Sequence, residues 1–135
     1  MKILIIGQAP AAVKQEVPYD TTYLYTMLEW VGISKEKAQE MFEFEAMTDK
    51  FPGHGVNGHK IPSQEEMKDY LDRVLGDKIK NSDKIIVLGN VAKYNLDYTY
   101  LENKQVVYLM HPSKRNHNLI FKNKDEIINK LKSLL

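Results

Sequence analysis

One segment of the sequence combines residue types that could bind a ligand and act on it. Residues 111–116 read His-Pro-Ser-Lys-Arg-Asn, so a histidine lies beside a hydroxyl, two cations and an amide, that of Asn116. Ser113 and the backbone N–H groups of such a loop can hold a phosphate, and Lys114 and Arg115 can bind phosphates without reading a base sequence. The simpler interpretation of the same residues is a solvated basic loop.

Two more segments, Gly-Gln-Ala-Pro at residues 7–10 and Gly-Asn at residues 89–90, resemble this one in position. The three segments follow expected strands at residues 3–6, 84–88 and 105–110, and each strand contains an apolar run without polar alternation. Runs without polar alternation are typical of strands that are buried on both faces of a parallel sheet. Because parallel strands end at one edge of their sheet, the three segments are predicted to line one crevice there.

Two helices are expected between the first strand and a long irregular loop at residues 51–62. Asp20 can cap the first helix, in which apolar residues recur at helical spacing, and Gly32 suits its end. The second helix is expected to begin at Ser34. The side chains that it should carry inward are those of Ala38, Met41 and Phe42.

Three more helices complete the pattern. Ser63 opens a capping box, and apolar residues then recur at helical spacing as far as Ile79. A short helix is expected at residues 91–96, and a C-terminal helix from about Lys124. The C-terminal helix is expected to bury Ile127, Ile128, Leu131, Leu134 and Leu135. Alternating strands and helices predict one domain over residues 1–135, a three-layer αβα sandwich around a short, mostly parallel sheet.

The composition narrows the class of protein. The formal net charge is only +1, so any surface that binds nucleic acid must be local. The chain has no cysteine, which excludes disulfides, iron–sulfur clusters and thiol catalysis. No apolar run approaches the length that spans a membrane. These features predict a soluble, cytoplasmic protein without a membrane partner.

Taken in order, the motifs resemble those of the uracil-DNA glycosylase superfamily. They are Gly7-Gln8-Ala9-Pro10, Pro18-Tyr19, Val31-Gly32-Ile33, Pro52-Gly53, Ile61-Pro62, the run from Ile86 to Ala92, and His111-Pro112-Ser113. The first motif, GQAPAA, is most similar to the shorter microbial branches that read GEAPG or GLAPAA rather than GQDPY. The likeness extends from residue 3 to about residue 118. It implies a short parallel sheet flanked by helices, with the site at its carboxyl edge.

The resemblance implies a DNA glycosylase that hydrolyses the N-glycosidic bond of uracil or another altered base. Such an enzyme extrudes the nucleotide into a pocket and holds its base by stacking and by hydrogen bonds to its edge. The stacking residue of the family corresponds to Tyr19, beside Ala9 and Pro10. The histidine that stabilises the leaving base corresponds to His111. Gln8, in the first motif, is the residue that could hold the attacking water by hydrogen bonds.

The first motif departs from the family in the group that activates this water. Ala9 stands where one branch has an Asp that places the water, and Gln8 stands where another branch has a Glu. Glu16 or Asp20 could replace the missing carboxylate. General-base help is worth about two to four orders of magnitude, so its loss slows a glycosylase without abolishing the reaction.

The residue that reads the base edge also differs. Glu45 falls where the branch that contains an iron–sulfur cluster has an Asn. An ionised Glu only accepts hydrogen bonds, so it would suit a base that presents N–H groups rather than the O4 of uracil. Asn57 and Asn90 are the alternatives for edge recognition.

No cofactor is expected. His54 and His59 lack a third ligand at a recognised spacing, so they do not predict a metal site. The expected partner is DNA with the altered base flipped into the pocket, bound by a monomer.

Two hypotheses of function therefore remain. The first is the glycosylase, which His111 and Tyr19 favour. The second is a non-catalytic relative that binds a base, a nucleotide or DNA, which Gln8 and Ala9 favour because they leave the first motif without an acid.

Overall fold

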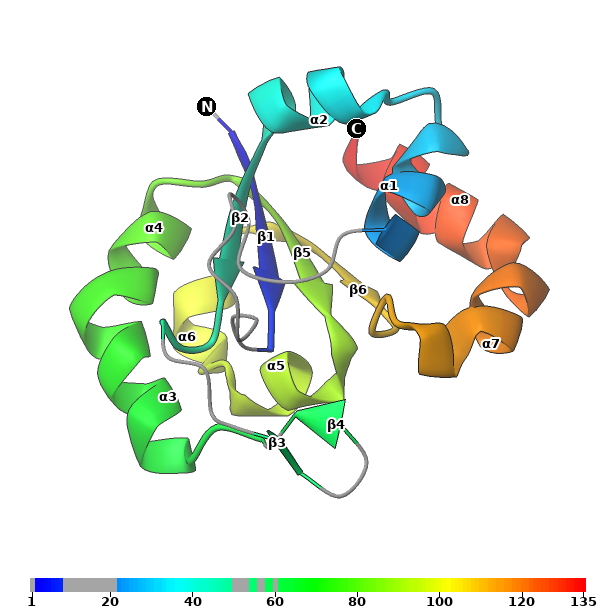
Figure 1. The fold of residues 1–135 in the computed structure, drawn as a ribbon. Coiled ribbons are helices and arrows are strands. Elements are labelled where there is room, and N and C mark those ends of the chain that lie inside the picture. Colours follow the sequence, from blue (N-terminus) through cyan, green and yellow to red (C-terminus); the bar gives the residue numbers. More distant parts are fainter. Residues whose placement is uncertain (1, 9–21, 50–53, 56–57, 60) are drawn as a thin grey trace.

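A central sheet of four parallel strands organises the protein. The computed structural model describes residues 2–8, 22–49, 54–55, 58–59 and 61–135. The strand order is β2-β1-β5-β6. The strands are β1 (Ile3–Gly7), β2 (Phe42–Ala46), β5 (Lys84–Leu88) and β6 (Gln105–Leu109). Because all neighbouring pairs are parallel, the four carboxyl ends share one edge of the sheet, the lower edge in Figure 1.

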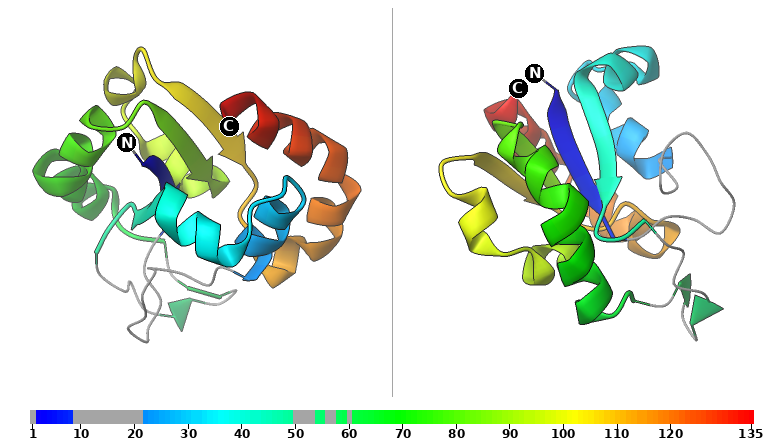
Figure 2. Two further views of the ribbon diagram at one scale, coloured as in Figure 1. Left: turned by 90° about the horizontal axis from the view of Figure 1, so that it is seen from above. Right: turned by 90° about the vertical axis from the view of Figure 1, so that its left-hand side faces the viewer.

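Helices cover both faces of this sheet, and Figure 2 shows the resulting layers. One face packs against α1 (Thr22–Glu29), α2 (Lys35–Met41), α7 (His117–Lys122) and α8 (Lys124–Leu134). The other packs against α3 (Gln64–Tyr70), a π-helical turn (Leu71–Leu75), α4 (Gly76–Lys80), α5 (Gly89–Asn95) and α6 (Tyr98–Leu101). A 3-10 turn (Lys114–Asn116) precedes α7, and β3 (His54–Gly55) pairs with β4 (Gly58–His59). The predicted three-layer sandwich is confirmed.

The first strand joins the two hydrophobic cores. Ile3 and Ile5 pack on the side of α1 and α8, whereas Leu4 and Ile6 pack on the side of α3 to α6. Leu4, Ile5 and Ile6 are each 0% exposed. Full burial of an aliphatic side chain of this size contributes about 1.5–3 kcal/mol. The unbroken apolar run thus reflects a strand with a core on each face.

Local signals begin and end the helices where the sequence predicts. The Ser34 hydroxyl accepts a hydrogen bond of 3.2 Å from the Lys37 N–H at the start of α2, and the Ser63 hydroxyl accepts one of 3.1 Å from the Glu66 N–H at the start of α3. Such caps satisfy N–H groups that have no partner within the helix. After α1, Gly32 takes a φ of +82°, a left-handed conformation that glycine adopts without strain. The Asp20 cap lies outside the described residues.

One prediction is wrong at the end of α2. Phe42 was expected to complete that helix, but the helix ends at Met41 and Phe42 begins the edge strand β2. The sequence of β2, FEFEA, alternates with the period of a strand. Its two phenylalanines pack with the core on the α1 side. The signal was present but covers only five residues, directly after a helix.

Other differences lie near the C-terminus and in short elements. Leu135 was expected to be buried but is 41% exposed, because α8 ends at Leu134 and turns Ile127, Leu131 and Leu134 toward the core. The helices α6 and α7, with four and six residues, were not predicted, because helical periodicity needs a longer window. Among the helices of the described ranges, none has the length and apolar character needed to cross a membrane.

Candidate functional site

The ends of β1 and β2 are joined by backbone hydrogen bonds at the carboxyl edge. The Met47 N–H donates to the carbonyl oxygens of Gly7, at 3.0 Å, and of Gln8, at 3.3 Å. Gln8 is half-buried there. Its backbone is therefore held at the end of the sheet, as the sequence predicts for a segment that lines the site.

The first residue of α5, which directly follows β5, contacts the loop that follows β6. A Cβ atom added to Gly89 would lie 3.1 Å from Cβ and 3.3 Å from Cδ2 of His111. Gly89 also has a φ of +83°, which residues other than glycine rarely adopt. A glycine is thus needed at this position for two reasons, and the half-buried His111 rests against its Cα. Although Gly89 directly follows a buried strand, the sequence did not reveal it as the support of His111.

The loop of His111 is closed by hydrogen bonds to its own carbonyl oxygen. That oxygen accepts from the Ser113 N–H and from Asn116 Nδ2, each at 2.9 Å. The Asn116 N–H in turn donates to the Ser113 carbonyl at 2.9 Å. Asn116, predicted to bind DNA, therefore has a positioning contact with the candidate catalytic loop. Between these residues, Lys114 and Arg115 are exposed.

Glu45 lies near the carboxyl end of β2, but its carboxylate already has protein partners. Its Oε1 accepts from the Tyr70 hydroxyl at 2.8 Å and from the Ala46 N–H at 3.2 Å, and its Oε2 accepts from Lys78 Nζ at 2.5 Å. The Glu45 side chain is only 12% exposed. Lys78 also bonds Glu43 at 3.0 Å. A base edge would have to compete with this network, so the contacts favour a structural role for Glu45.

The same network shifts the pKa values of its donors. Burial and, next, the hydrogen bond to Glu45 raise the pKa of Tyr70, so its hydroxyl stays protonated and donates. Burial lowers the pKa of Lys78, but hydrogen bonds and charge interactions with Glu45 and Glu43 outweigh it, and the net direction is upward. The network is therefore held with Lys78 charged.

The remaining residues that the sequence singled out fall into three groups. Asn90 is exposed at the start of α5, next to Gly89, so the fold brings it to the predicted edge. The residues that lie outside the described ranges are Ala9, Pro10, Glu16, Tyr19, Asp20 and Asn57. His54 and His59 are paired in register between β3 and β4. Within the described ranges no group of three or more His, Cys, Asp or Glu could hold a metal ion.

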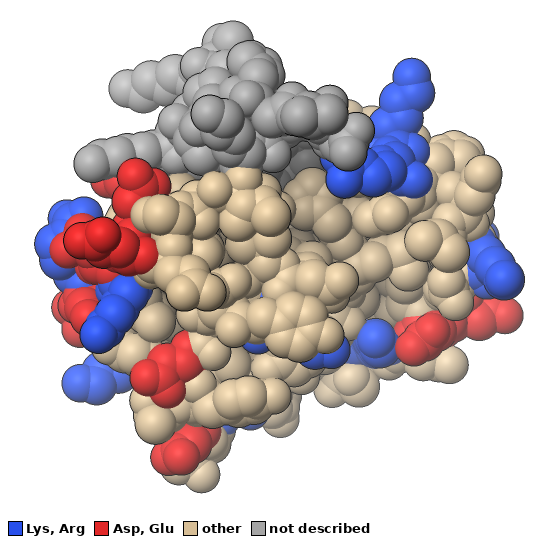
Figure 3. Space-filling view, turned by 90° about the horizontal axis from the view of Figure 1, so that it is seen from below, with Lys and Arg blue, Asp and Glu red and all other residues tan. Residues whose placement is uncertain are grey.

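Charge is distributed unevenly along this edge. Residues 111–124 contain Lys114, Arg115, Lys122 and Lys124 and no Asp or Glu. On the other side, α3 and the π-helical turn carry Glu65, Glu66, Asp69 and Asp72. Figure 3 looks onto the edge from below and shows Lys and Arg side chains at the upper right next to the grey residues, whereas acidic and basic side chains are mixed on the left. The side that continues from His111 is thus the one suited to an anion.

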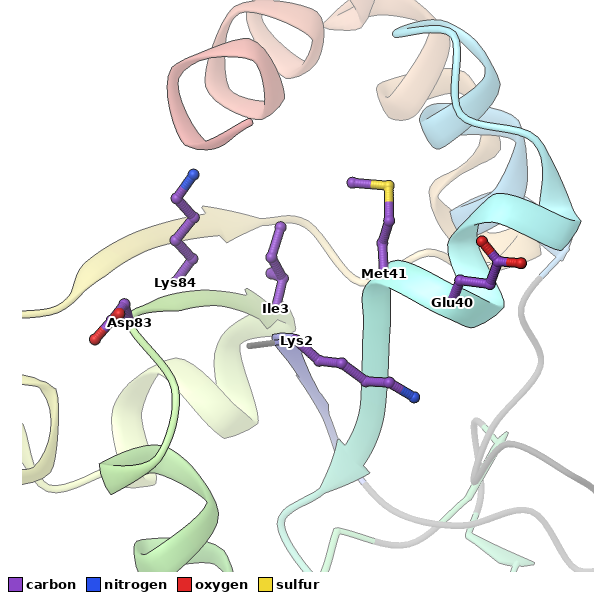
Figure 4. A pocket seen from close by; sticks show the side chains of 6 residues that line it. All are labelled: Lys2, Ile3, Glu40, Met41, Asp83 and Lys84. Atoms are coloured by element: carbon purple, nitrogen blue, oxygen red, sulfur yellow. The ribbon is translucent and has the colours of Figure 1, made fainter.

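A hollow of about 350 Å³ lies at the other end of the sheet. Its lining residues are Lys2, Ile3, Glu40, Met41, Asp83 and Lys84, which lie where β1 and β5 begin and where α2 ends. In Figure 4 the acidic groups of Glu40 and Asp83 lie at opposite ends of the hollow, so its polar groups do not converge. The described residues of the three motif segments follow the opposite ends of the strands, so the hollow is not the predicted site.

Comparison with known proteins bears on the whole chain. The model of a family described as the uracil DNA glycosylase superfamily matches residues 1–132. No curated protein matches the sequence at a significant level. The match covers all four strands of the parallel sheet.

Proposed function

The chain belongs to the uracil-DNA glycosylase superfamily, and we propose that it is a DNA glycosylase that hydrolyses the N-glycosidic bond of uracil or another altered base. The observation that carries the proposal is the contact between His111 and Gly89, which fixes a histidine at the edge where the strands that precede the motif segments end. We propose that the protein acts as a monomer and needs neither a metal nor an organic cofactor. The proposed location is the cytoplasm.

In the proposed reaction, His111 acts on the leaving base. Water adds to C1′ of the deoxyribose and releases a proton to the solvent, the C1′–N bond breaks with its electron pair leaving on the base, and the base takes up a proton from the solvent. A donor fixed near the base oxygen stabilises this developing negative charge and need not reorganise during the reaction. The hydrogen bonds at the His111 carbonyl and the close contact with Gly89 supply that rigidity.

The attacking water is assigned to Gln8. Its side chain can hold a water by hydrogen bonds but cannot take its proton, because an amide is not a base at neutral pH. The missing base costs about two to four orders of magnitude in rate. Most of the proposed catalysis therefore depends on His111 and on capture of the base, the role proposed for Tyr19, Ala9, Pro10 and Asn90.

The phosphates beside the extruded nucleotide are assigned to Ser113, Lys114 and Arg115. The cations are exposed and follow directly on the loop of His111. Contacts of this kind fix the position of the protein on DNA without reading its sequence.

The alternative function is a relative that binds a base or DNA without cleaving it. Two observations favour it: the first motif has no acid at Gln8, and the carboxylate of Glu45 is already bonded to Tyr70 and Lys78. Such a protein would still use the His111 loop and its cations.

A single-turnover assay separates the two functions. The protein is incubated in excess with oligonucleotides that carry uracil, hypoxanthine, xanthine or hydroxymethyluracil, and alkali then cleaves the abasic sites. We expect cleavage of at least one substrate, its loss in His111→Ala, and a gain on uracil in Gln8→Asp. If wild type and Gln8→Asp cleave none of the four while a free base raises the melting temperature, the binder is the correct function.

A further inference from the structure

A row of aromatic side chains runs away from the candidate site, on α7 and in the turn that follows α1. The ring centroids of His117 and Phe121 are 4.8 Å apart, and those of Phe121 and Trp30 are 5.5 Å apart, with an edge-to-face angle of 73°. At its far end, Lys124 Nζ lies 5.1 Å from the centroid of the Trp30 ring. We call His117, Phe121, Trp30 and Lys124 the aromatic row.

The row is held in place from behind but exposed in front. Ile120 anchors α7 in the core and is 0% exposed, whereas Phe121 is 46% exposed. The ring of His117 is fixed by the Tyr23 hydroxyl, which lies 2.9 Å from its Nδ1. Since Lys124 lies over the face of Trp30, Phe121 is the ring best placed to receive another flat group.

Positive charge borders the row on the side of the His111 loop, whereas Glu29 and Asp125 adjoin Trp30 and Lys124 at its far end. Lys114 and Arg115 precede it, Lys122 follows Phe121, and no acidic residue interrupts residues 111–124. A surface that serves only apolar packing would not need these cations. Rings interleaved with cations match the two parts of a single strand of nucleic acid, because its bases stack and its phosphates carry the charge.

We propose that the aromatic row binds single-stranded DNA next to the excision site, with an unpaired base stacked on Phe121. The inference rests on the proposed function only for its location, since the row continues directly from the loop of His111. Duplex DNA keeps its bases stacked inside the helix, so it cannot place one on Phe121. The row would therefore give the protein a preference for single-stranded over double-stranded DNA.

The test measures the affinity of the full chain for an undamaged, labelled oligo-dT by fluorescence anisotropy, beside a duplex of the same length. We expect Phe121→Ala to weaken binding of oligo-dT about five- to a hundred-fold, the range for stacking one base, and to change duplex affinity less than two-fold. Phe121→Tyr should restore the affinity, because it keeps a ring. Phe121→Leu, which keeps apolar volume, should not, and it replaces the Ala variant if that one fails to fold.

Tyr98→Ala is the matched control. Tyr98 is 74% exposed on α6, which covers the opposite face of the sheet. The inference is overturned if wild type does not bind oligo-dT, if Phe121→Leu binds it as well as Phe121→Tyr, or if Tyr98→Ala loses as much affinity. Base cleavage is measured separately. If the protein cleaves an altered base but its binding of oligo-dT does not depend on Phe121, the proposed function stands and this inference is overturned. If binding depends on Phe121 but no base is cleaved, the inference stands and the proposed function is overturned.

Discussion

The two sides of the carboxyl edge use charged side chains in opposite ways. On the α3 side, Glu45 and Glu43 are bonded to Lys78, and Tyr70 completes the network, so the charges largely satisfy one another. On the α7 side, Lys114 and Arg115 lie exposed in a segment without any acidic residue. Removal of one partner from a partly buried ion pair destabilises a fold, whereas exposed cations that share one surface attract anions from solution.

This comparison predicts two separable kinds of mutant. Changes on the α7 side should alter the reaction or DNA binding and leave stability almost unchanged. Changes on the α3 side should alter stability and leave DNA affinity unchanged. A variant that removes a charged side chain from either side and affects both properties equally would contradict the division.

The largest effect is expected for His111→Ala on the α7 side. Removal of one preorganised donor typically lowers the rate about a hundred- to a thousand-fold. We expect single-turnover cleavage to fall by this factor while the affinity for substrate DNA stays within a few-fold. A parallel drop in affinity and cleavage would instead assign His111 to binding.

The next effect is expected for Gly89→Ala, because its φ is +83° and the new Cβ would meet His111 at 3.1 Å. Strain of this kind costs about 1–3 kcal/mol, measurable by urea unfolding. Displacement of His111 should lower cleavage as well. Gly32→Ala is the control, since Gly32 has a φ of +82° but no atom within 4 Å of the added Cβ. It should lose stability and keep its specific activity; equal loss of activity in both variants would show that strain alone matters.

On the α3 side, Lys78→Met should lower the free energy of unfolding by about 1–2 kcal/mol, because Glu43 and Glu45 then lie together without their cation. This figure is kept below that of a fully buried pair, because the Lys78 side chain is 34% exposed and solvent screens it. DNA affinity should not fall. Lys80→Met, at an exposed position of the same helix, is the control for stability.

The pH dependence of this stabilisation follows from the upward pKa shifts of Lys78 and Tyr70. A group whose pKa is raised on folding stabilises the protein below its ordinary pKa, and this contribution is lost as the pH rises through the folded value. The ordinary values are 10.5 and 10.0. Stability should therefore fall above about pH 10, and less steeply in Lys78→Met. The same slope in both proteins would exclude this network as its cause.

The smallest effect is expected for the double variant Lys114→Ala with Arg115→Ala. If each cation contacts one phosphate, the slope of log affinity against log salt should decrease by about two. The comparison is the double variant Lys68→Ala with Arg73→Ala, which removes two exposed cations from the α3 side. That control should keep the wild-type slope, and a slope that is unchanged in both variants would make residues 114 and 115 an ordinary solvated surface.

The sequence by itself determined the features that depend on neighbouring residues. The apolar runs predicted β1, β5 and β6, the hydroxyls of Ser34 and Ser63 predicted two helix starts, and Gly32 predicted the end of α1. Each of these signals works over a few residues, because a cap or a buried strand requires particular side chains at its own position. The order of the motifs indicated the family, and the family's fold predicted that the motifs meet at one edge of the sheet.

Only the tertiary structure decided how residues far apart in the chain meet. Glu45 could be assigned to a base edge from the sequence, but the fold brings Tyr70 and Lys78 to its two oxygens from 25 and 33 residues away. The contact of His111 with Gly89 is equally invisible in the sequence, because it depends on the spacing of two parallel strands. Side-chain type limits what a residue can do, but the partners that the fold supplies decide which of those roles remain open to it.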